Sequence, residues 1–282
     1  MIVLKKTFKL LGLLIVLLVS FIYTNNVFNI VKKKDRIMKE VINYKSIHEI
    51  KPIEPIINKD EVTIGSSGIS VNEELSYKKM KKENRFNEND IVYKSIKPTK
   101  KISDLLDYYI SRGSTKNNSV SIIFKVKSDY NLNELLNLLD EYNLNITFFI
   151  DGYYVENNLS MILDINKQKH EIYNLGYINK YDNNISRINK LLESITLNKS
   201  VYCLNEKKNE KYKNICKRKK MYSIFPTITN PNLEELKKVM LKGTIISYDL
   251  EEFDISKFDT IYKIIYSRGL KVDYLKNILN EN

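Results

Sequence analysis

Hydrophobic and polar positions follow one regular pattern over the second half of the chain. From Ser119 onward, short β-branched or aromatic runs alternate with amphipathic helical stretches. This alternation is typical of parallel strands joined by crossover helices. It predicts seven strands, at residues 120–126, 145–151, 170–174, 200–204, 221–225, 244–248 and 270–272. Helices are predicted over 132–142, 185–195, 233–241 and 255–267, with Asn230 or Asn232 as the N-cap of the third and Gly243 beyond its end.

Seven strand-helix units favour one particular α/β architecture. We expect a distorted (β/α)7 TIM-like barrel over residues 119–282, because a barrel leaves no strand edge unpaired. Short apolar alternations at 62–64 and 91–93 and an amphipathic helix at 102–111 predict a small appended N-terminal layer over 62–118. Residues 32–61 are charged, contain Pro52 and Pro55, and predict a stalk and linker.

The N-terminus has a targeting pattern. Lys5, Lys6 and Lys9 precede an uncharged apolar run, LLGLLIVLLVSFIY, at residues 10–23. The run is shorter than the ~20 residues of a usual span and suits a signal peptide by length, but no small residues of the A-x-A type mark a cleavage site. We expect a basic cytoplasmic segment at 1–9 and an uncleaved single-pass transmembrane signal anchor at 10–31; cleavage is the alternative.

Composition narrows the chemistry. Hydrophobic residues make up 43% of the 282 residues, which is enough for a buried core, and the net charge is +12. No basic stripe alternates with aromatic residues, so we expect a lysine-rich solvated surface and no nucleic-acid partner. Only two histidines occur, which leaves little material for a histidine-based metal site.

Several stretches together carry a family resemblance. They are SVSIIFKV at 119–126, NELLNLLDEYNLNITFFIDG at 133–152, KHEIYNLGYIN at 169–179, KGTIISYD at 242–249 and SRGLKVDYLKNIL at 267–279. This pattern resembles the polysaccharide deacetylase family, the NodB homology domain. The resemblance implies a distorted (β/α) barrel, a location outside the membrane, and removal of acetyl groups from wall polysaccharides by a divalent metal, usually zinc.

The positions that would perform this chemistry carry other residues. Where the family has two aspartates, a general base and a metal ligand, this chain has Lys125 and Val126. The metal-binding H-x-x-x-H falls on Leu175 and Asn179, and the late histidine falls on Asp249. Zinc needs about three protein ligands to activate water, and a lysine is protonated at neutral pH unless it is strongly desolvated. We therefore expect no zinc, no other cofactor and no acetamide hydrolysis.

The remaining polar residues in this region allow two interpretations of the site. The family's arginine-proline motif is absent from residues 202–205, and His170 aligns with a histidine of the turn that is not a ligand. Asp129, Asp151 and Asp249 lie at or just past the C-terminal ends of predicted strands. Three carboxylates could hold Mg²⁺ or Ca²⁺, or they could cap helices and face water.

Aromatic residues and cysteines complete the list of candidates. Four tyrosines fall beside positions that line the family's cleft: Tyr153, Tyr173, Tyr177 and Tyr248. Their rings could form a platform for a glycan. The alternative is that they are half-buried residues without a binding role, among the twenty tyrosines of the chain. Cys203 and Cys216 lie thirteen positions apart, which permits a disulfide outside the membrane; two buried free thiols are the alternative.

Three functions follow from these features. The first is a membrane-anchored, extracytoplasmic, deacetylase-like protein without catalysis that binds cell-wall polysaccharide or assembles an envelope complex. The second is an active carbohydrate esterase that uses non-standard residues. The third is a purely structural anchor whose stalk and appended layer, over residues 62–114, hold an envelope protein as partner.

Overall fold

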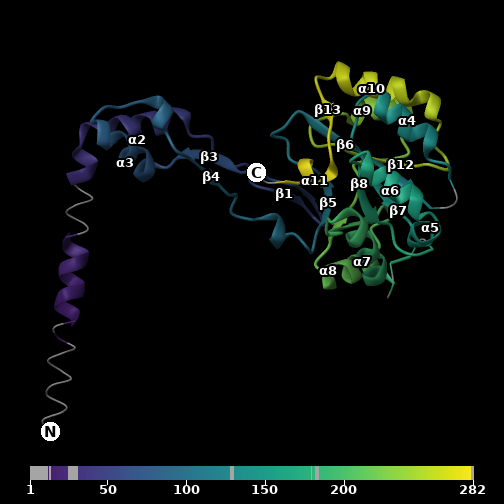
Figure 1. Cartoon of the computed structure of the whole chain (residues 1–282), viewed down its shortest axis with the longest axis horizontal. Helices are drawn as coiled ribbons and strands as arrows, with labels where there is room; N and C mark the ends of the chain where they lie inside the picture. Colours follow the sequence, from purple (N-terminus) through teal and green to yellow (C-terminus); the bar gives the residue numbers. More distant parts are fainter. Residues whose placement is uncertain are drawn as a thin grey trace, which may run out of the picture. The chain divides into compact units, whose positions relative to one another are not determined.

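The computed structural model describes Gly12 and residues 14–24, 31–127, 130–178, 180–181 and 184–280 (Figure 1). Its chain forms two compact units, one from residues up to Lys51 together with Gly68–Ile96, the other from Pro52–Ser67 and Lys97–Asn282. Residues 14–24 are helical. Within the described ranges, no helix has the length and apolar character needed to cross a membrane. Residues 10, 11, 13 and 25–30 of the predicted anchor lie outside those ranges.

The first unit is built from two helices and a hairpin. Helix α2 (Arg36–His48) packs against α3 (Glu73–Glu83), and β3 (Gly68–Val71) pairs antiparallel with β4 (Tyr93–Ile96) after the 3-10 turn η1 (Glu88–Asp90). Ile37, Val41 and Met80 are fully buried between these elements. The predicted stalk at 32–61 is therefore not a separate segment, because the apolar face of α2 is part of this core.

The main sheet of the second unit contains the best-predicted strands. Its order is β11 (Ile228–Thr229), β12 (Ile245–Asp249), β6 (Ser119–Val126), β7 (Thr147–Ile150) and β8 (Glu171–Asn174), all parallel, and β13 (Lys271–Val272) pairs with the start of β6. Every residue of β6 is buried. Burial on both faces is typical of a parallel sheet covered by helices.

A second sheet holds the remaining strands. Its order is β1 (Ile56–Asn58), β2 (Glu61–Thr63), β5 (Tyr109–Arg112), β10 (Tyr222–Ile224) and β9 (Tyr202–Leu204), in which only β1 and β2 are antiparallel. The predicted appended layer at 62–118 is thus divided, since its strands β2 and β5 belong to this sheet. The predicted helix at 102–111 is wrong. A short 3-10 turn, η2 (Ile102–Asp104), precedes β5, where pairing with β2 and β10 overrides the local pattern.

All seven predicted strands are present, but they do not close a barrel. No backbone ladder joins β8 to β9 in the described residues; instead the Asn174 N–H donates to the Ser200 side chain at 3.4 Å. On the other side, a single isolated bridge in the described part of the chain joins Arg112, at the end of β5, to Thr244, the residue before β12. The fold is α/β and related to a TIM-like barrel, but the predicted closed (β/α)7 barrel is wrong.

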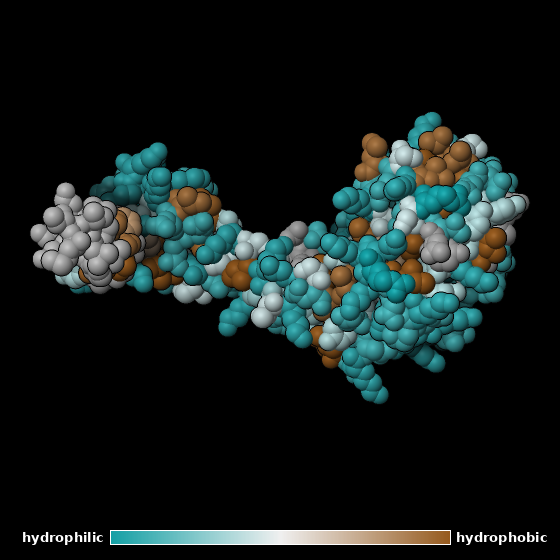
Figure 2. All heavy atoms as spheres, turned by 90° about the horizontal axis from the view of Figure 1, so that it is seen from below, coloured by the Kyte–Doolittle hydropathy of each residue, from teal (hydrophilic) through white to brown (hydrophobic). Residues whose placement is uncertain are grey.

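Helices cover the two sheets of this unit and form the core with them. They are α4 (Asn133–Glu141), α5 (Gly152–Asn157), α6 (Leu159–Lys167), α7 (Ile185–Thr196), α8 (Glu210–Arg218), α9 (Leu233–Val239), η3 (Ile255–Lys257), α10 (Phe258–Ser267) and α11 (Leu275–Ile278). Asn232 caps α9, and Gly243 has a φ of +75° at a place where a Cβ would lie 2.4 Å from a backbone oxygen. Figure 2 shows a face on which hydrophilic residues predominate, as the lysine-rich composition predicts.

Candidate functional site

A pocket of about 320 Å³ lies at the carboxyl ends of β6, β8 and β9. Barrel enzymes place their active sites at this end of the strands. The pocket is lined by four charged residues and by polar, aromatic and aliphatic ones: Lys125, Lys127, Glu206, Lys207, Asn205, Asn209, Tyr181, Tyr212, Leu175 and Leu204.

An ion-pair network joins three of these lining residues, Lys125, Lys127 and Glu206, to Asp249. We call these four residues the Lys125 cluster. The Lys125 side chain is only 5% exposed, and its Nζ lies 2.7 Å from Glu206 Oε2 and 3.7 Å from Asp249 Oδ2. Lys127 pairs with the same Asp249 oxygen. A buried ammonium is tolerated only when carboxylates compensate its lost hydration. The two lysines and two carboxylates thus neutralise each other.

Neighbouring groups hold the carboxylates of the Lys125 cluster in place. Ser247 Oγ donates to Glu206 Oε1 at 2.8 Å, and the Asp249 N–H donates to Asn230 Oδ1 at 2.7 Å. Burial, together with the positive charge of Lys125, lowers the pKa of Lys127. The arrangement is an internally satisfied network.

The side chains at the family's metal position do not fit a zinc ion. Lys125 places an ammonium there, Leu175 contributes an aliphatic wall, and Val126 packs in the hydrophobic core under the helices. Asn179 lies in the part of the chain that the structure does not describe. In the part that it does describe, no three His, Cys, Asp or Glu side chains gather in a metal-binding arrangement. The residues themselves are therefore incompatible with the family's metal chemistry.

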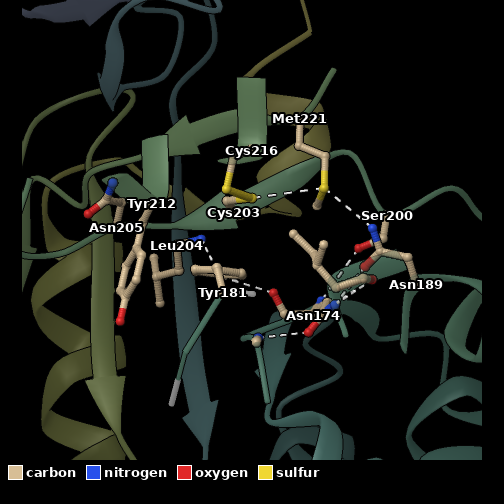
Figure 3. Close-up of a disulfide and its surroundings, with 12 residues drawn as sticks. Asn174, Tyr181, Asn189, Ser200, Cys203, Leu204, Asn205, Tyr212, Cys216 and Met221 are labelled. Atoms are coloured by element: carbon tan, nitrogen blue, oxygen red, sulfur yellow. Dashed lines mark hydrogen bonds between the residues drawn. A yellow bond between two sulfur atoms is a disulfide. The ribbon is translucent and has the colours of Figure 1, made fainter. Parts of the chain in front are cut away.

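The turn after β8 is fixed by buried hydrogen bonds. Asn174 Nδ2 donates to Asn189 Oδ1 at 2.7 Å, and Asn174 Oδ1 accepts from the Gly176 N–H at 2.7 Å. The Tyr181 hydroxyl donates to the Asn174 carbonyl at 3.0 Å and accepts from the Leu204 N–H at 2.9 Å (Figure 3). These bonds join the turn to β9 and set the wall of the pocket.

A disulfide joins Cys203 in β9 to Cys216 in α8, with their Cα atoms 6.3 Å apart (Figure 3). Both residues are completely buried, and Met221 Sδ lies 3.9 Å from Cys203 Sγ. The segment between strand and helix carries Glu206 of the cluster. Within it, the Asn205 side chain donates to the Asn209 carbonyl and accepts from the Asn209 N–H. The disulfide and this double hydrogen bond position one side of the pocket.

Two of the four candidate tyrosines lie together. Tyr153 lies in the first turn of α5, and Tyr177 follows β8; their ring centroids are 6.5 Å apart in an edge-to-face arrangement. The Tyr153 side chain is 49% exposed. The Arg187 guanidinium lies 5.2 Å from the centre of the Tyr177 ring. This pair is an accessible aromatic surface.

The other two tyrosines lie elsewhere. Tyr173 is buried between Phe149 and Tyr202, at ring distances of 5.4 and 5.0 Å, and lines a different pocket. Tyr248 precedes Asp249 in β12 and therefore points to the opposite face of the sheet. None of the four candidate tyrosines lines the pocket beside Lys125, and Tyr173 and Tyr248 lie in two different pockets, so the structure does not gather the four into one groove.

Two of the remaining candidates, His170 and Asp151, have structural roles. His170 Nδ1 accepts from the Ile146 N–H at 3.3 Å, and burial lowers the pKa of His170 to about 4. Asp151 caps α5 by accepting from the Tyr153 N–H and also accepts from the Ile178 N–H, which favours the cap over a cation site. Asp129 is not among the described residues.

Sequence reasoning missed the residue that completes the cluster. Glu206 follows β9 by two positions, at the carboxyl end where the site was expected. A carboxylate just past a predicted strand was the available signal. Tyr181 and Lys127 were missed as well, because neither occupies a position of the family's motifs.

Comparisons with known proteins agree with this geometry. Residues 112–222 match the sequence profile of the polysaccharide deacetylase family. The uncharacterized protein YlxY of Bacillus subtilis (strain 168) is 34% identical over 147 residues, which are 51% of this chain and 46% of that protein. The aligned region thus spans about half the length of this relative.

Two solved structures show the same fold. A CE4 family pseudoenzyme from Bacillus anthracis superposes with a TM-score of 0.65 and 22% identity, over 88% of this chain and 96% of that one. The family 4 carbohydrate esterase PdaA of Bacillus subtilis reaches a TM-score of 0.50 and 16% identity, over 61% and 84%. The resemblance found in the sequence is confirmed over residues 112–222, which match the polysaccharide deacetylase profile, and the fold is that of the CE4 structures.

Proposed function

Starting from a degenerate polysaccharide deacetylase domain, we propose that this chain is a membrane-anchored, extracytoplasmic pseudoenzyme that binds cell-wall polysaccharide, and so serves in wall binding or envelope assembly. The observation that carries the proposal is the Lys125 ammonium, held by Glu206 and Asp249 where the family's chemistry takes place.

Acetamide hydrolysis needs an activated water and a group that can accept its proton. The Lys125 ammonium has no lone pair for this role, and its two carboxylate partners are engaged with cations. The fold likeness to a CE4 family pseudoenzyme, which extends over 88% of this chain, supports the same conclusion.

The membrane anchor is supported by the N-terminal helix. The apolar side chains of the helical residues from Leu14 to Tyr23 are each at least half exposed, with Phe21 at 71% and Tyr23 at 70%. Exposed apolar surface of this kind favours a lipid environment. The disulfide between Cys203 and Cys216 supports an oxidising compartment outside the cytoplasm.

The Tyr153 and Tyr177 pair supports polysaccharide binding. Aromatic faces bury the apolar faces of sugar rings, and Tyr153 offers an exposed ring next to the carboxyl ends of the strands. An envelope protein is the other partner that such a surface could accept.

Two assays on the purified full-length chain test this function. We expect no stoichiometric zinc and no acetate release from acetylated glycan. Zinc with turnover would overturn the proposal and establish the active esterase with non-standard residues.

Sedimentation with wall polysaccharide tests the binding surface. A Tyr153→Ala/Tyr177→Ala double variant should bind about tenfold more weakly, because both rings are removed. Tyr266→Ala is the matched control, since Tyr266 is 72% exposed on α10. Equal binding of the double variant and the control would exclude this surface.

A further inference from the structure

A second pocket, of about 700 Å³, lies on the other side of β12 from Asp249, between the segments that follow β11 and β12. We call it the β12 pocket. It is separate from the Lys125 cluster, and none of the charged residues of that cluster lines it.

The wall of the β12 pocket is aromatic and aliphatic. The rings of Tyr248 and Phe253 lie 4.8 Å apart, and the Phe253 ring meets Phe124 edge-on at 4.9 Å. Leu233 and Ile261 complete the apolar lining. Because Phe253 is only partly buried, part of its ring is accessible to a ligand.

One polar atom of this wall lacks a partner. The Tyr248 side chain is only 4% exposed, and its hydroxyl makes no hydrogen bond to any described residue. A buried hydroxyl without a partner is unfavourable, so native structures normally supply one. A ligand hydroxyl or water in the adjacent pocket would supply it here.

The charge of the β12 pocket is opposite to that of the whole chain. Its lining includes three carboxylates, from Glu234, Glu252 and Asp254, but only one lysine, Lys257, whereas the chain carries +12. Asp254 is paired with Lys257 at 3.3 Å.

Glu252 is the carboxylate available to a cationic ligand. It accepts a hydrogen bond from Asn230 Nδ2 at 2.6 Å but forms no ion pair with any described residue. Glu234, in contrast, pairs with Lys237 at 2.8 Å. A free carboxylate beside aromatic rings favours an ammonium group attached to an apolar body.

We propose that the β12 pocket binds an amino-sugar unit with a free, protonated amine. The apolar face of the sugar lies against Phe253, its ammonium pairs with Glu252, and one of its hydroxyls bonds the Tyr248 hydroxyl. The sugar class rests on the proposed function, whereas the free amine follows from the charges of the pocket. A lysine side chain shares the ammonium but brings no hydroxyl for Tyr248.

Calorimetric titration of the full-length chain, in weakly acidic buffer that keeps the amine protonated, tests the inference. The probes are a β-1,4-linked glucosamine tetramer, its fully N-acetylated form, and tetralysine. We expect the glucosamine tetramer to bind about tenfold more tightly than the N-acetylated form, because acetylation removes the charge that Glu252 recognises.

Two near-isosteric variants assign the contacts. Glu252→Gln should weaken glucosamine binding about tenfold and leave the N-acetylated form unaffected. Tyr248→Phe should weaken glucosamine binding about threefold, the loss of one neutral hydrogen bond. Glu141→Gln, at an exposed carboxylate of α4, is the matched control and should change neither.

The failures are distinguishable. Equal affinity for both tetramers with no effect of Glu252→Gln would overturn the inference while leaving wall-polysaccharide binding intact. If tetralysine binds as tightly as the glucosamine tetramer, the pocket recognises a basic peptide and the amino-sugar inference is wrong. If no glycan binds, here or in the sedimentation assay, the proposed function fails as well.

Discussion

The two faces of β12 differ in whether their polar groups have partners. On one face, Asp249 lies in the Lys125 cluster, where every charge has a partner. On the other face, Tyr248 has no hydrogen-bond partner among the described residues, and the neighbouring Glu252 has no ion pair there. Tyr248 and Asp249 are adjacent in β12, so this strand lies between a cluster whose charges neutralise each other and a pocket with polar groups available to a ligand. Substitutions at Lys125 and Tyr248 test how far this contrast holds.

The largest effect is expected from Lys125→Met. This variant leaves Glu206 without an ion pair among the described residues and Asp249, 4% exposed, with Lys127 alone. Removing one partner of a buried pair typically costs about 4 kcal/mol, which we expect as the loss in the free energy of unfolding measured by urea denaturation.

Lys263→Met is the control, because Lys263 is 73% exposed in its pair with Asp259. Its effect should stay below about 1 kcal/mol. If both variants lose the same small amount, the Lys125 cluster is not a buried compensated network and the contrast between the two faces of β12 fails.

An intermediate effect is expected from acid, through a residue that belongs to neither face of β12. Burial lowers the pKa of His170 from 6.5 to about 4, so the unfolded chain binds the proton first. Stability present above pH 6.5 is therefore lost as the pH falls toward 4, and this group adds no further loss below it. One pKa unit corresponds to about 1.4 kcal/mol, which gives about 3 kcal/mol over this window.

His170→Gln separates this contribution from the rest. Urea unfolding of the wild type and the variant across the same pH window should show a flatter dependence in the variant, because glutamine does not titrate. A slope equal to that of the wild type would mean that the acid sensitivity comes from other groups, the Lys125 cluster among them.

The smallest effects are expected from a matched pair of Tyr→Phe variants. Tyr181→Phe removes a hydroxyl that makes two buried hydrogen bonds, so the free energy of unfolding should fall by about 2 kcal/mol. Tyr248→Phe removes a hydroxyl that has no hydrogen-bond partner among the described residues, so stability should stay within about 0.5 kcal/mol of the wild type or rise. Equal losses in thermal or urea unfolding would show that the Tyr248 hydroxyl is bonded after all.

Much of the fold could be predicted because local patterns determine it. The run at 119–126 is apolar throughout and becomes the fully buried β6, and Asn232 with Gly243 marks the two ends of the segment that contains α9. Likewise, Val126 and Leu175 cannot ligate a metal in any conformation. These features depend on neighbouring residues or on side-chain chemistry alone.

The errors share one cause. The segment at 102–111 has a helical pattern, yet Tyr109 and Ile110 form a strand because β2 and β10 flank them. The expected closure of the barrel failed where β8 should meet β9, a pairing that no local pattern reports. Strand order and sheet closure depend on contacts between residues far apart in the chain.

The sequence by itself determined the seven strands predicted beyond residue 119, the resemblance to polysaccharide deacetylases and the loss of their metal ligands. Only the tertiary structure decided what replaced them, because Lys125, Glu206 and Asp249 come from three strand ends separated by 81 and 43 positions. It also decided that Tyr173 and Tyr248 do not join Tyr153 and Tyr177. Burial and ion pairing are properties of groups brought together by folding, and a linear pattern does not contain those distances.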